Sequence, residues 1–108
     1  MILELLGHKD YIRVLAAVER KPLRFTEIQK ELDLNPTQVD RAVTFLRNGL
    51  FIIPKTVPAD KGPVRVVYAA GKRGKAFLES FDAFQKKAEQ HEAELGPSEV
   101  AELQTLSR

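Results

Sequence analysis

The amino-acid sequence predicts a small α+β fold, mostly α, in a chain of 108 residues. Three observations lead to this fold class. Amphipathic helical periodicity recurs in three segments between residues 9 and 50. Two runs rich in Val and Ile, FIIPKTV and VRVVYAA, then flank the turn-forming cluster PADKGP, which is typical of a β-hairpin. The last segment, from residue 71 to residue 95, has the pattern of one long helix.

The composition is that of a folded, water-soluble protein. Hydrophobic residues make up 44% of the chain and charged residues 30%, a balance that argues against full disorder. The absence of cysteine excludes disulfides, thiolate metal sites and cysteine redox sensing, and it favours an intracellular protein. The first ten residues do not resemble a signal peptide, and no run approaches the ~20 apolar residues of a membrane span. We expect a cytoplasmic protein without a membrane anchor.

The net charge of +2 conceals an asymmetry along the chain. Residues 1–75 contain 14 Lys or Arg against 8 Asp or Glu, a net of +6, whereas residues 76–108 contain 3 against 7, a net of −4. A basic body with an acidic C-terminal segment suggests an anionic partner for the first part and a different role for the second. Ordinary surface charge that keeps the protein soluble is the alternative explanation.

The first two predicted helices precede residue 33. The first covers residues 9–19 and has one apolar side: Ile12, Leu15, Ala16 and Val18. A break at Gly7 separates it from three earlier leucines. Residues 23–25 can form a very short strand after Pro22. Thr26 then begins the second helix, with Gln29 at the spacing of a capping box, and Asp33 ends it.

The segment LNPTQVDRAVTFLRNGL predicts a third helix with a well-defined start. Asn35 is placed to cap it, Pro36 stands at the first helical position, and the Gln38 side chain can return a hydrogen bond to the cap. Four residues step by four, three and four and predict one buried stripe: Val39, Val43, Leu46 and Leu50. Gly49 is the expected terminator.

The second and third helices fit a helix-turn-helix by their apolar spacing. Ile28 and Leu32 face inward from the first of the two, Leu34 fills the turn, and Val39 and Ala42 face inward from the second. The hairpin that follows is then a wing. The sequence therefore predicts a winged helix-turn-helix with a two-stranded β-hairpin wing and a long C-terminal helix. Two amphipathic helices and a hairpin also occur in other small α+β domains.

The chain resembles winged-helix transcription regulators, most closely the HxlR-type group within the MarR- and ArsR-like set. The resemblance runs from about Leu5 to Phe77, and its most specific part is PLRFTEIQKEL. LELLGHKDYIRVLAAV is similar to the group's opening helix, LNPTQVDRAVTFLRNGL to its recognition helix, and VRVVYAAGKRGKAF to the second wing strand and closing helix. The resemblance implies sequence-selective binding to double-stranded DNA as a homodimer. Residues 1–75 would form the DNA-binding domain and residues 76–108 a helical dimerisation segment.

The candidate DNA contacts lie on two elements. Helix 35–48 would enter the major groove, where its outer face presents donors and acceptors to base edges: Thr37, Gln38, Asp40, Arg41 and Thr44. The wing at residues 58–63 would lie on the DNA backbone or in the minor groove. The candidate backbone contacts are basic: Lys55, Lys61, Arg65, Arg24 and Lys30. The alternatives are ordinary solvated residues on the helix and charges that protect the edge of the hairpin.

The last helix carries a heptad pattern that predicts a dimer interface. The seam steps alternately by four and three residues: Phe77, Phe81, Phe84, Ala88, His91 and Leu95. A compact winged domain can cover Phe77 and part of Phe81, so the remainder is expected to meet a second copy. Leu3, Leu5 and Leu6 are candidates for the same interface. The alternative is that the helix folds back on its own core.

No motif in the sequence indicates catalysis, a cofactor or a metal. The chain has no Gly-rich phosphate loop after a strand and no paired nucleophile and base, and we expect it not to be an enzyme. His8 and His91 lack metal-ligand spacing, and His91 is expected to be a packing residue. No polar cluster identifies a small-molecule effector. The main rival to DNA binding is a winged helix that binds protein partners, because fold does not determine function.

Overall fold

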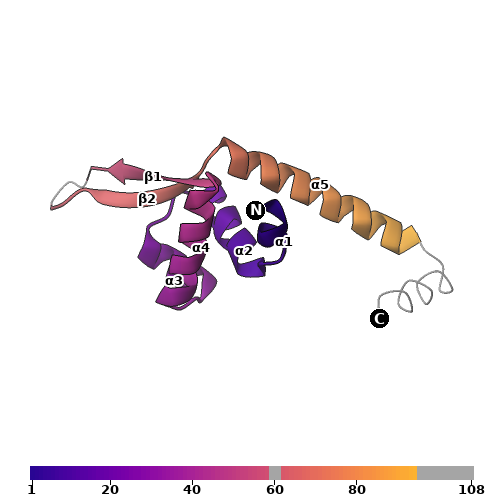
Figure 1. Cartoon of the computed structure of the whole chain (residues 1–108), viewed down its shortest axis with the longest axis horizontal. Helices are drawn as coiled ribbons and strands as arrows, with labels where there is room; N and C mark the ends of the chain where they lie inside the picture. The colour runs from indigo at the N-terminus through magenta and orange to yellow at the C-terminus, as the bar shows by residue number, and fades with distance from the viewer. Residues whose placement is uncertain (59–61, 95–108) are drawn as a thin grey trace. The chain divides into compact units, whose positions relative to one another are not determined.

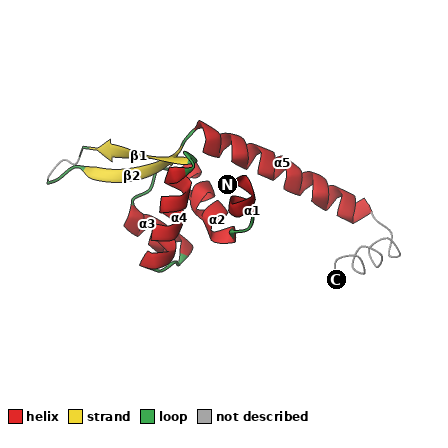
Figure 2. Ribbon diagram, viewed as in Figure 1, coloured by secondary structure: helices red, strands yellow, loops and turns green. Residues whose placement is uncertain are grey.

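The computed structural model describes residues 1–58 and 62–94. Five helices and one two-stranded antiparallel sheet follow one another in the described part of the chain (Figures 1 and 2). The elements are α1 (Ile2–Leu6), α2 (Lys9–Arg20), α3 (Phe25–Leu32), α4 (Pro36–Asn48), β1 (Ile52–Val57), β2 (Arg65–Ala70) and α5 (Lys72–Glu94). This order confirms the mostly helical α+β class, the hairpin and the long last helix. The short helix expected near Ser98 lies outside the described residues.

The chain divides into two compact units, Met1–Leu78 and Glu79–Arg108. The first unit contains the hydrophobic core, which α2 and α4 supply from facing sides: Val14, Leu15, Ala17, Val18, Val39, Ala42, Val43 and Leu46. Leu5 of α1 is completely buried in the same core. The expectation that Leu5 contributes to a dimer interface is therefore wrong, because its side chain already packs within its own chain.

Helix α3 begins one residue earlier than expected and is capped by a different pair. Arg24 occupies the N-cap position, and the Glu27 carboxylate accepts a hydrogen bond from its backbone N–H at 2.9 Å. The predicted capping box of Thr26 and Gln29 is therefore wrong: both residues lie inside the helix, which starts at Phe25. Asp33 ends the helix in a left-handed conformation, with φ of 53°, as the sequence predicted for its position.

Helix α4 starts and ends where predicted, but its buried stripe is shorter than predicted. Asn35 and Gln38 form the expected reciprocal cap around Pro36. Val39 and Leu46 are fully buried, but Leu50 is 66% exposed, so it does not belong to the predicted stripe. The reason is that α4 stops at Asn48 and the chain turns through Leu50, which adopts a left-handed φ of 60°. Gly49 itself has an ordinary φ of −87° and is close-packed against Phe51 instead.

The hairpin joins the helical part of the first unit through its inner end. Strands β1 and β2 pair in a register that places Ile52 opposite Ala70 and Val57 opposite Arg65. Leu23 adds a single bridge to Tyr68, with backbone hydrogen bonds of 3.0 and 2.7 Å. Of the very short strand expected at residues 23–25 only this bridge forms, because Phe25 already begins α3. Ile52 and Ala70 are buried while Val57 and Arg65 are exposed. The root of the hairpin is thus anchored in the core.

Phe51 joins the ends of four elements. Its ring is fully buried, its N–H donates to the Leu46 carbonyl at 2.8 Å, and its carbonyl accepts from the Gly71 N–H at 2.9 Å. The Arg73 guanidinium lies 4.6 Å from the centre of the Phe51 ring and donates to the Gly49 carbonyl at 2.8 Å. These contacts explain the cation at the unfavourable N-terminal end of α5: Arg73 holds that end against the end of α4.

Gly74 allows the first turn of α5 to approach β1 closely. A Cβ atom at this position would lie 2.2 Å from the Phe51 carbonyl oxygen and 2.8 Å from Cδ1 of Leu15. The first obstacle is backbone that is already hydrogen-bonded, so it cannot move aside without breaking the junction. Any side chain at Gly74 therefore forces α5 away from the core.

We predict that Gly74→Ala lowers the free energy of unfolding by about 3 kcal/mol, the upper part of the range for overpacking a core. The measurement is urea denaturation followed by circular dichroism. Gly7→Ala is the matched control, because its added Cβ would meet only backbone oxygens at 3.5 and 3.6 Å, an ordinary contact distance. Equal stabilities of the two variants would contradict the close approach of α5.

We also predict a specific pH dependence at the start of α3. The hydrogen bond from the Arg24 backbone N–H holds the pKa of Glu27 below its ordinary value of 4.5. A lowered folded-state pKa stabilises the fold above the unfolded-state pKa, and this stabilisation is lost as the pH falls through the folded-state value. Glu27→Gln should therefore cost more stability at pH 6 than at pH 3 in urea denaturation. Glu19→Gln, a carboxylate on the exposed end of α2, is the control, and an equal pH dependence in both variants would refute the assignment.

Candidate nucleic-acid interface

The polar face predicted for the third helix is solvent-exposed on α4. All five residues of this face are exposed: Thr37, Gln38, Asp40, Arg41 and Thr44. The opposite side of the helix is buried in the core through Val39, Ala42, Val43 and Leu46. Helical periodicity produces this separation, because residues three and four apart share a face. The structure therefore brings the five candidates together on one surface with hydrogen-bonding groups of both kinds.

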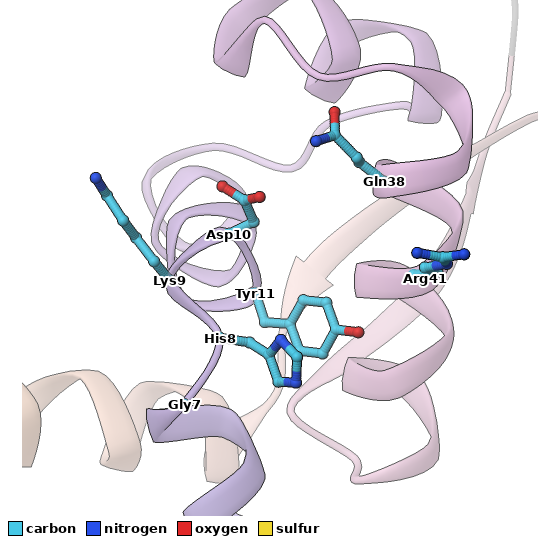
Figure 3. Close-up of a pocket in the computed structure, with 7 residues that line it drawn as sticks. All are labelled: Gly7, His8, Lys9, Asp10, Tyr11, Gln38 and Arg41. Carbon is cyan, nitrogen blue, oxygen red and sulfur yellow. The ribbon is translucent and has the colours of Figure 1, made fainter.

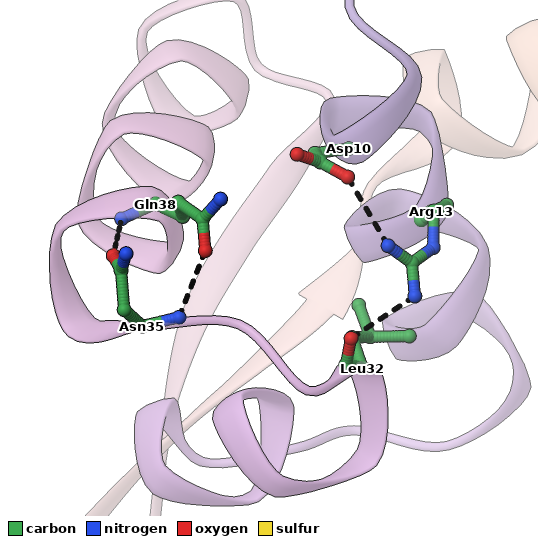
Figure 4. Close-up of polar contacts among 5 residues, drawn as sticks. All are labelled: Asp10, Arg13, Leu32, Asn35 and Gln38. Atoms are coloured by element: carbon green, nitrogen blue, oxygen red, sulfur yellow. Dashed lines mark hydrogen bonds and ion pairs between the residues drawn. The ribbon is translucent and has the colours of Figure 1, made fainter.

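Gln38 has a structural function at the start of this face. Its backbone N–H donates to Oδ1 of Asn35 at 2.8 Å, and its side-chain Oε1 accepts from the Asn35 backbone N–H at 2.9 Å (Figure 4). The side-chain amide is consequently fixed in one orientation at the first turn of α4. Its oxygen retains a second lone pair and its nitrogen retains two donors, so it can still bind a partner, but only in the direction that the cap imposes.

A second polar contact positions α2 beside the helix-turn-helix. The Arg13 guanidinium donates to the Asp10 carboxylate at 3.1 Å and to the Leu32 carbonyl at 3.0 Å (Figure 4). Leu32 is the last residue of α3, whose final carbonyls have no partner within the helix. Arg13 therefore satisfies one of these carbonyls and ties the first turns of α2 to the turn that precedes α4.

A shallow pocket borders the exposed face of α4. Residues 7–11 line one side and Gln38 and Arg41 line the other, around a volume of about 370 Å³ (Figure 3). The rings of His8 and Tyr11 are stacked with their centres 4.4 Å apart, and Tyr11 in turn lies 5.0 Å from Phe45. The sequence analysis did not include residues 8–11 in the candidate site. The contact between the half-buried Tyr11 and Phe45 is the signal that α2 packs beside α4. Nothing in the sequence shows that these two side chains meet.

The structure describes four of the five candidate backbone contacts. Lys55 and Arg65 are exposed and lie on the same face of the hairpin, because each strand alternates its side chains and the register places Arg65 opposite Val57. Lys30 is exposed on α3, whereas Arg24 is half-buried and its Nε donates weakly, at 3.4 Å, to Glu27. Lys61 and the centre of the wing lie outside the described residues.

The candidate dimer residues differ in their exposure. Leu3 is 83% exposed and Phe84 69% exposed, and Leu6, Ala88 and His91 are exposed as well. Phe77 packs edge-on against Phe51, with ring centres 6.1 Å apart. This residue of the predicted seam therefore also packs against the core of its own chain. Phe81 is half-buried. Leu95 lies outside the described residues.

The described ranges 1–58 and 62–94 lack two further kinds of site. Their His, Asp and Glu side chains form no group of three that is placed to hold a metal ion. None of the helices in this part of the chain combines the length and the apolar character that crossing a membrane requires.

Known proteins share this architecture and part of this sequence. No family model matches the chain. An uncharacterised HTH-type transcriptional regulator of Methanocaldococcus jannaschii is 33% identical over 82 residues, which cover 76% of this chain and 77% of that protein. The reduced form of the transcriptional regulator YodB of B. subtilis superposes with a TM-score of 0.72 at 22% identity, covering 82% of this chain and 86% of its own.

A PadR-family transcription regulator of Clostridium difficile R20291 superposes with a TM-score of 0.69 at 18% identity, over 81% of this chain and 97% of that one. At such identities the solved structures show the fold, which is that of winged-helix regulators. The M. jannaschii relative adds a sequence relationship that spans most of both chains. On this ground the protein belongs to the HTH-type transcriptional regulators, a class of DNA-binding proteins and not of enzymes.

Proposed function

We propose that this regulator binds double-stranded DNA sequence-selectively as a homodimer, with α4 in the major groove and the wing on the backbone or in the minor groove. The observation that carries the proposal is the exposed polar face of α4 opposite its buried apolar side. A major groove admits one α-helix, and its base edges are read by donors and acceptors on the outer face of that helix. Residues 1–75 would form the DNA-binding domain and residues 76–108 the dimerisation segment.

Two side chains of this face are chemically suited to read bases. The Arg41 guanidinium can donate two parallel hydrogen bonds to O6 and N7 of guanine, and the Gln38 amide can pair with adenine. The cap that fixes Gln38 reduces the conformational entropy it loses on binding. Thr37 and Thr44 add shorter hydroxyl contacts at the two ends of the face. Asp40 would repel phosphate, but it can accept from the cytosine amino group.

The basic side chains outside α4 are suited to contact phosphates. Lys55 and Arg65 share one face of the wing, and Lys61 belongs to its centre. Arg24 is the N-cap residue of α3 and Lys30 lies in its last turn, and α3 precedes α4 in the helix-turn-helix. Such contacts fix the position of a protein on the duplex and carry no sequence information themselves.

Dimerisation through α5 is supported by its exposed apolar seam. Phe84 is largely exposed although it is a large aromatic side chain, and Ala88 and His91 continue the same heptad spacing. Leu3 and Leu6 of α1 are further exposed apolar residues that can contribute. A two-fold dimer would present two copies of α4 to half-sites about one helical turn apart.

The proposal also covers the subgroup of regulators to which the protein is related, its cellular location and a small-molecule effector. The segment PLRFTEIQKEL and its neighbours support kinship with the HxlR-type group, within the wider MarR- and ArsR-like set. A regulator of transcription acts where the chromosome is, so we propose the cytoplasm as its location. The function as stated needs no cofactor, and nothing in the described residues identifies a small-molecule effector.

A protein-interaction module is the second candidate function. It is favoured by the low net charge of +2 and by Asp40, which stands on the face proposed to meet polyanionic DNA. The two functions differ in what Arg41 and Arg65 do, because an interaction module needs neither a base contact nor a phosphate contact.

We predict that Arg41→Ala weakens binding to a preferred duplex by about 1–3 kcal/mol and relaxes the base preference at one position. The preferred duplex is selected from a random-sequence pool with the wild-type protein, and affinities are measured by fluorescence anisotropy. Arg20→Ala is the matched control, since Arg20 is an exposed arginine in the last turn of α2 and is not among the candidate DNA contacts. Arg65→Ala should weaken all duplexes about equally and reduce the slope of log K against log salt by about 0.9. A wild-type protein that selects no sequence and shows no salt-dependent binding would support the interaction module instead.

We predict that Phe84→Glu converts the proposed dimer to a monomer, because a carboxylate would be buried at the two-fold interface without a partner. Sedimentation velocity at micromolar concentration gives the oligomeric state. Gln85→Glu introduces the same charge one residue away, off the seam, and should leave the dimer intact. A wild-type chain that sediments as a monomer would refute this part of the proposal.

A further inference from the structure

The pocket between α2 and α4 belongs to the same surface as the polar face of α4, but the proposed function does not use it. Residues 7–11 form one side of it, and Gln38 and Arg41 form the other, so two side chains of the reading face also line the pocket (Figure 3). Any group bound there would lie directly beside the DNA segment that α4 is proposed to read.

Tyr11 forms a rigid wall of this pocket. Its ring is stacked against His8 on one side and packs against Phe45 of α4 on the other, with ring centres 4.4 and 5.0 Å apart. The hydroxyl is directed toward Arg41 across the pocket (Figure 3). Among the described residues it has no hydrogen-bonding partner. A fixed ring with an unused donor beside a guanidinium is suited to bind an anionic oxygen.

The charges around the pocket also favour an anion. Lys9 and Arg41 line opposite sides of the pocket and both are exposed, and the Lys9 side chain extends outward from the rim, away from Tyr11 and Arg41 (Figure 3). Asp10 is the only acidic residue of the lining, and the Arg13 guanidinium is bound to its carboxylate at 3.1 Å. The lining residues alone therefore carry a net charge of +1, and the one negative group is already paired with a further cation.

The shape and lining point to DNA as the source of the anion. Sites for small organic ligands enclose most of the ligand, whereas this pocket is open to solvent, and six of its seven lining residues carry a polar or charged group. A helix in the major groove has phosphates at both edges of the groove, and the protein groups next to the helix contact them. The pocket adjoins α4 at Gln38, in its first turn, and at Arg41, one turn further on.

We propose that this pocket holds one phosphate of the DNA backbone, with the Tyr11 hydroxyl donating to a phosphate oxygen and the Lys9 ammonium adding charge from the rim. The inference rests on the proposed function, since it requires α4 to bind duplex DNA. It adds the first turn of α2 to the DNA footprint, and it gives Tyr11 and Lys9 a function that the winged fold itself does not require.

The test measures the affinity of the full chain for its selected duplex while single phosphates are replaced by neutral methylphosphonates along both strands. Tyr11→Phe removes only the hydroxyl and keeps the ring contacts, and Lys9→Ala removes an exposed cation, so both variants should fold. Tyr68→Phe and Lys21→Ala are the matched controls: Tyr68 is the other tyrosine, and Lys21 lies at the opposite end of α2.

We expect Tyr11→Phe to lose roughly tenfold in affinity, as for a hydrogen bond to a charged group, and Lys9→Ala to lower the salt slope by about 0.9. Both variants should keep the base preference of the wild type. Neutralising one particular phosphate should weaken the wild type and the two controls, but it should have little further effect on Tyr11→Phe or Lys9→Ala.

Two results would overturn the inference, and they are distinguishable. If the wild type prefers its selected duplex and both variants match it at every phosphate, the pocket does not hold a phosphate and the proposed function stands. If the wild type binds no duplex at all, the proposed function fails and this inference fails with it.

Discussion

The contact of Phe51 with the first turn of α5 is the constraint on which the arrangement of the first unit depends. The ring is the largest fully buried side chain, and the backbone on both sides of it bonds to the end of α4 and the start of α5. Gly74 permits the close approach of α5 to Phe51, and Arg73 stabilises it by donating a hydrogen bond to the Gly49 carbonyl. Because α4, the hairpin and α5 all begin or end within a few residues of this point, the direction of α4 relative to the hairpin is determined here.

The local features of the fold were predictable from the sequence, and the junction was not. The cap of Asn35 and Gln38 and the buried side of α4 depend on residues a few positions apart, and the turn-forming cluster PADKGP marks the hairpin, so periodicity and turn chemistry indicate them. The contact of Arg73 with Gly49 joins residues 24 positions apart. The exposure of Leu50 followed from this junction, because the chain has to leave the helical path before Phe51 can enter the core.

The candidate interface also has one part that the sequence predicts and one part that it does not. The exposed face of α4 follows from helical period alone, since burying Val39 and Leu46 leaves Gln38 and Arg41 in solvent. The pocket beside it could not be predicted in this way, because α2 contributes residues that are about thirty positions away in the chain. In the sequence, nothing distinguishes Tyr11 from an ordinary aromatic residue of the core. In the structure its ring contacts those of His8 and Phe45, and among the described residues its hydroxyl has no hydrogen-bonding partner.

Gln38 connects the stability of α4 with recognition. Its amide oxygen caps the helix, so in the proposed complex the side chain would meet DNA in an orientation that folding has already selected. A base that bonds to this amide without rotating it benefits from preorganisation, whereas a base that requires another rotamer must first break the cap, at a cost of about 1 kcal/mol. In the proposed complex the cap would therefore contribute to discrimination at that base pair, because it restricts the rotamer in which the Gln38 amide is presented. Helix stability and base preference at this position cannot be changed independently, because both depend on the one amide.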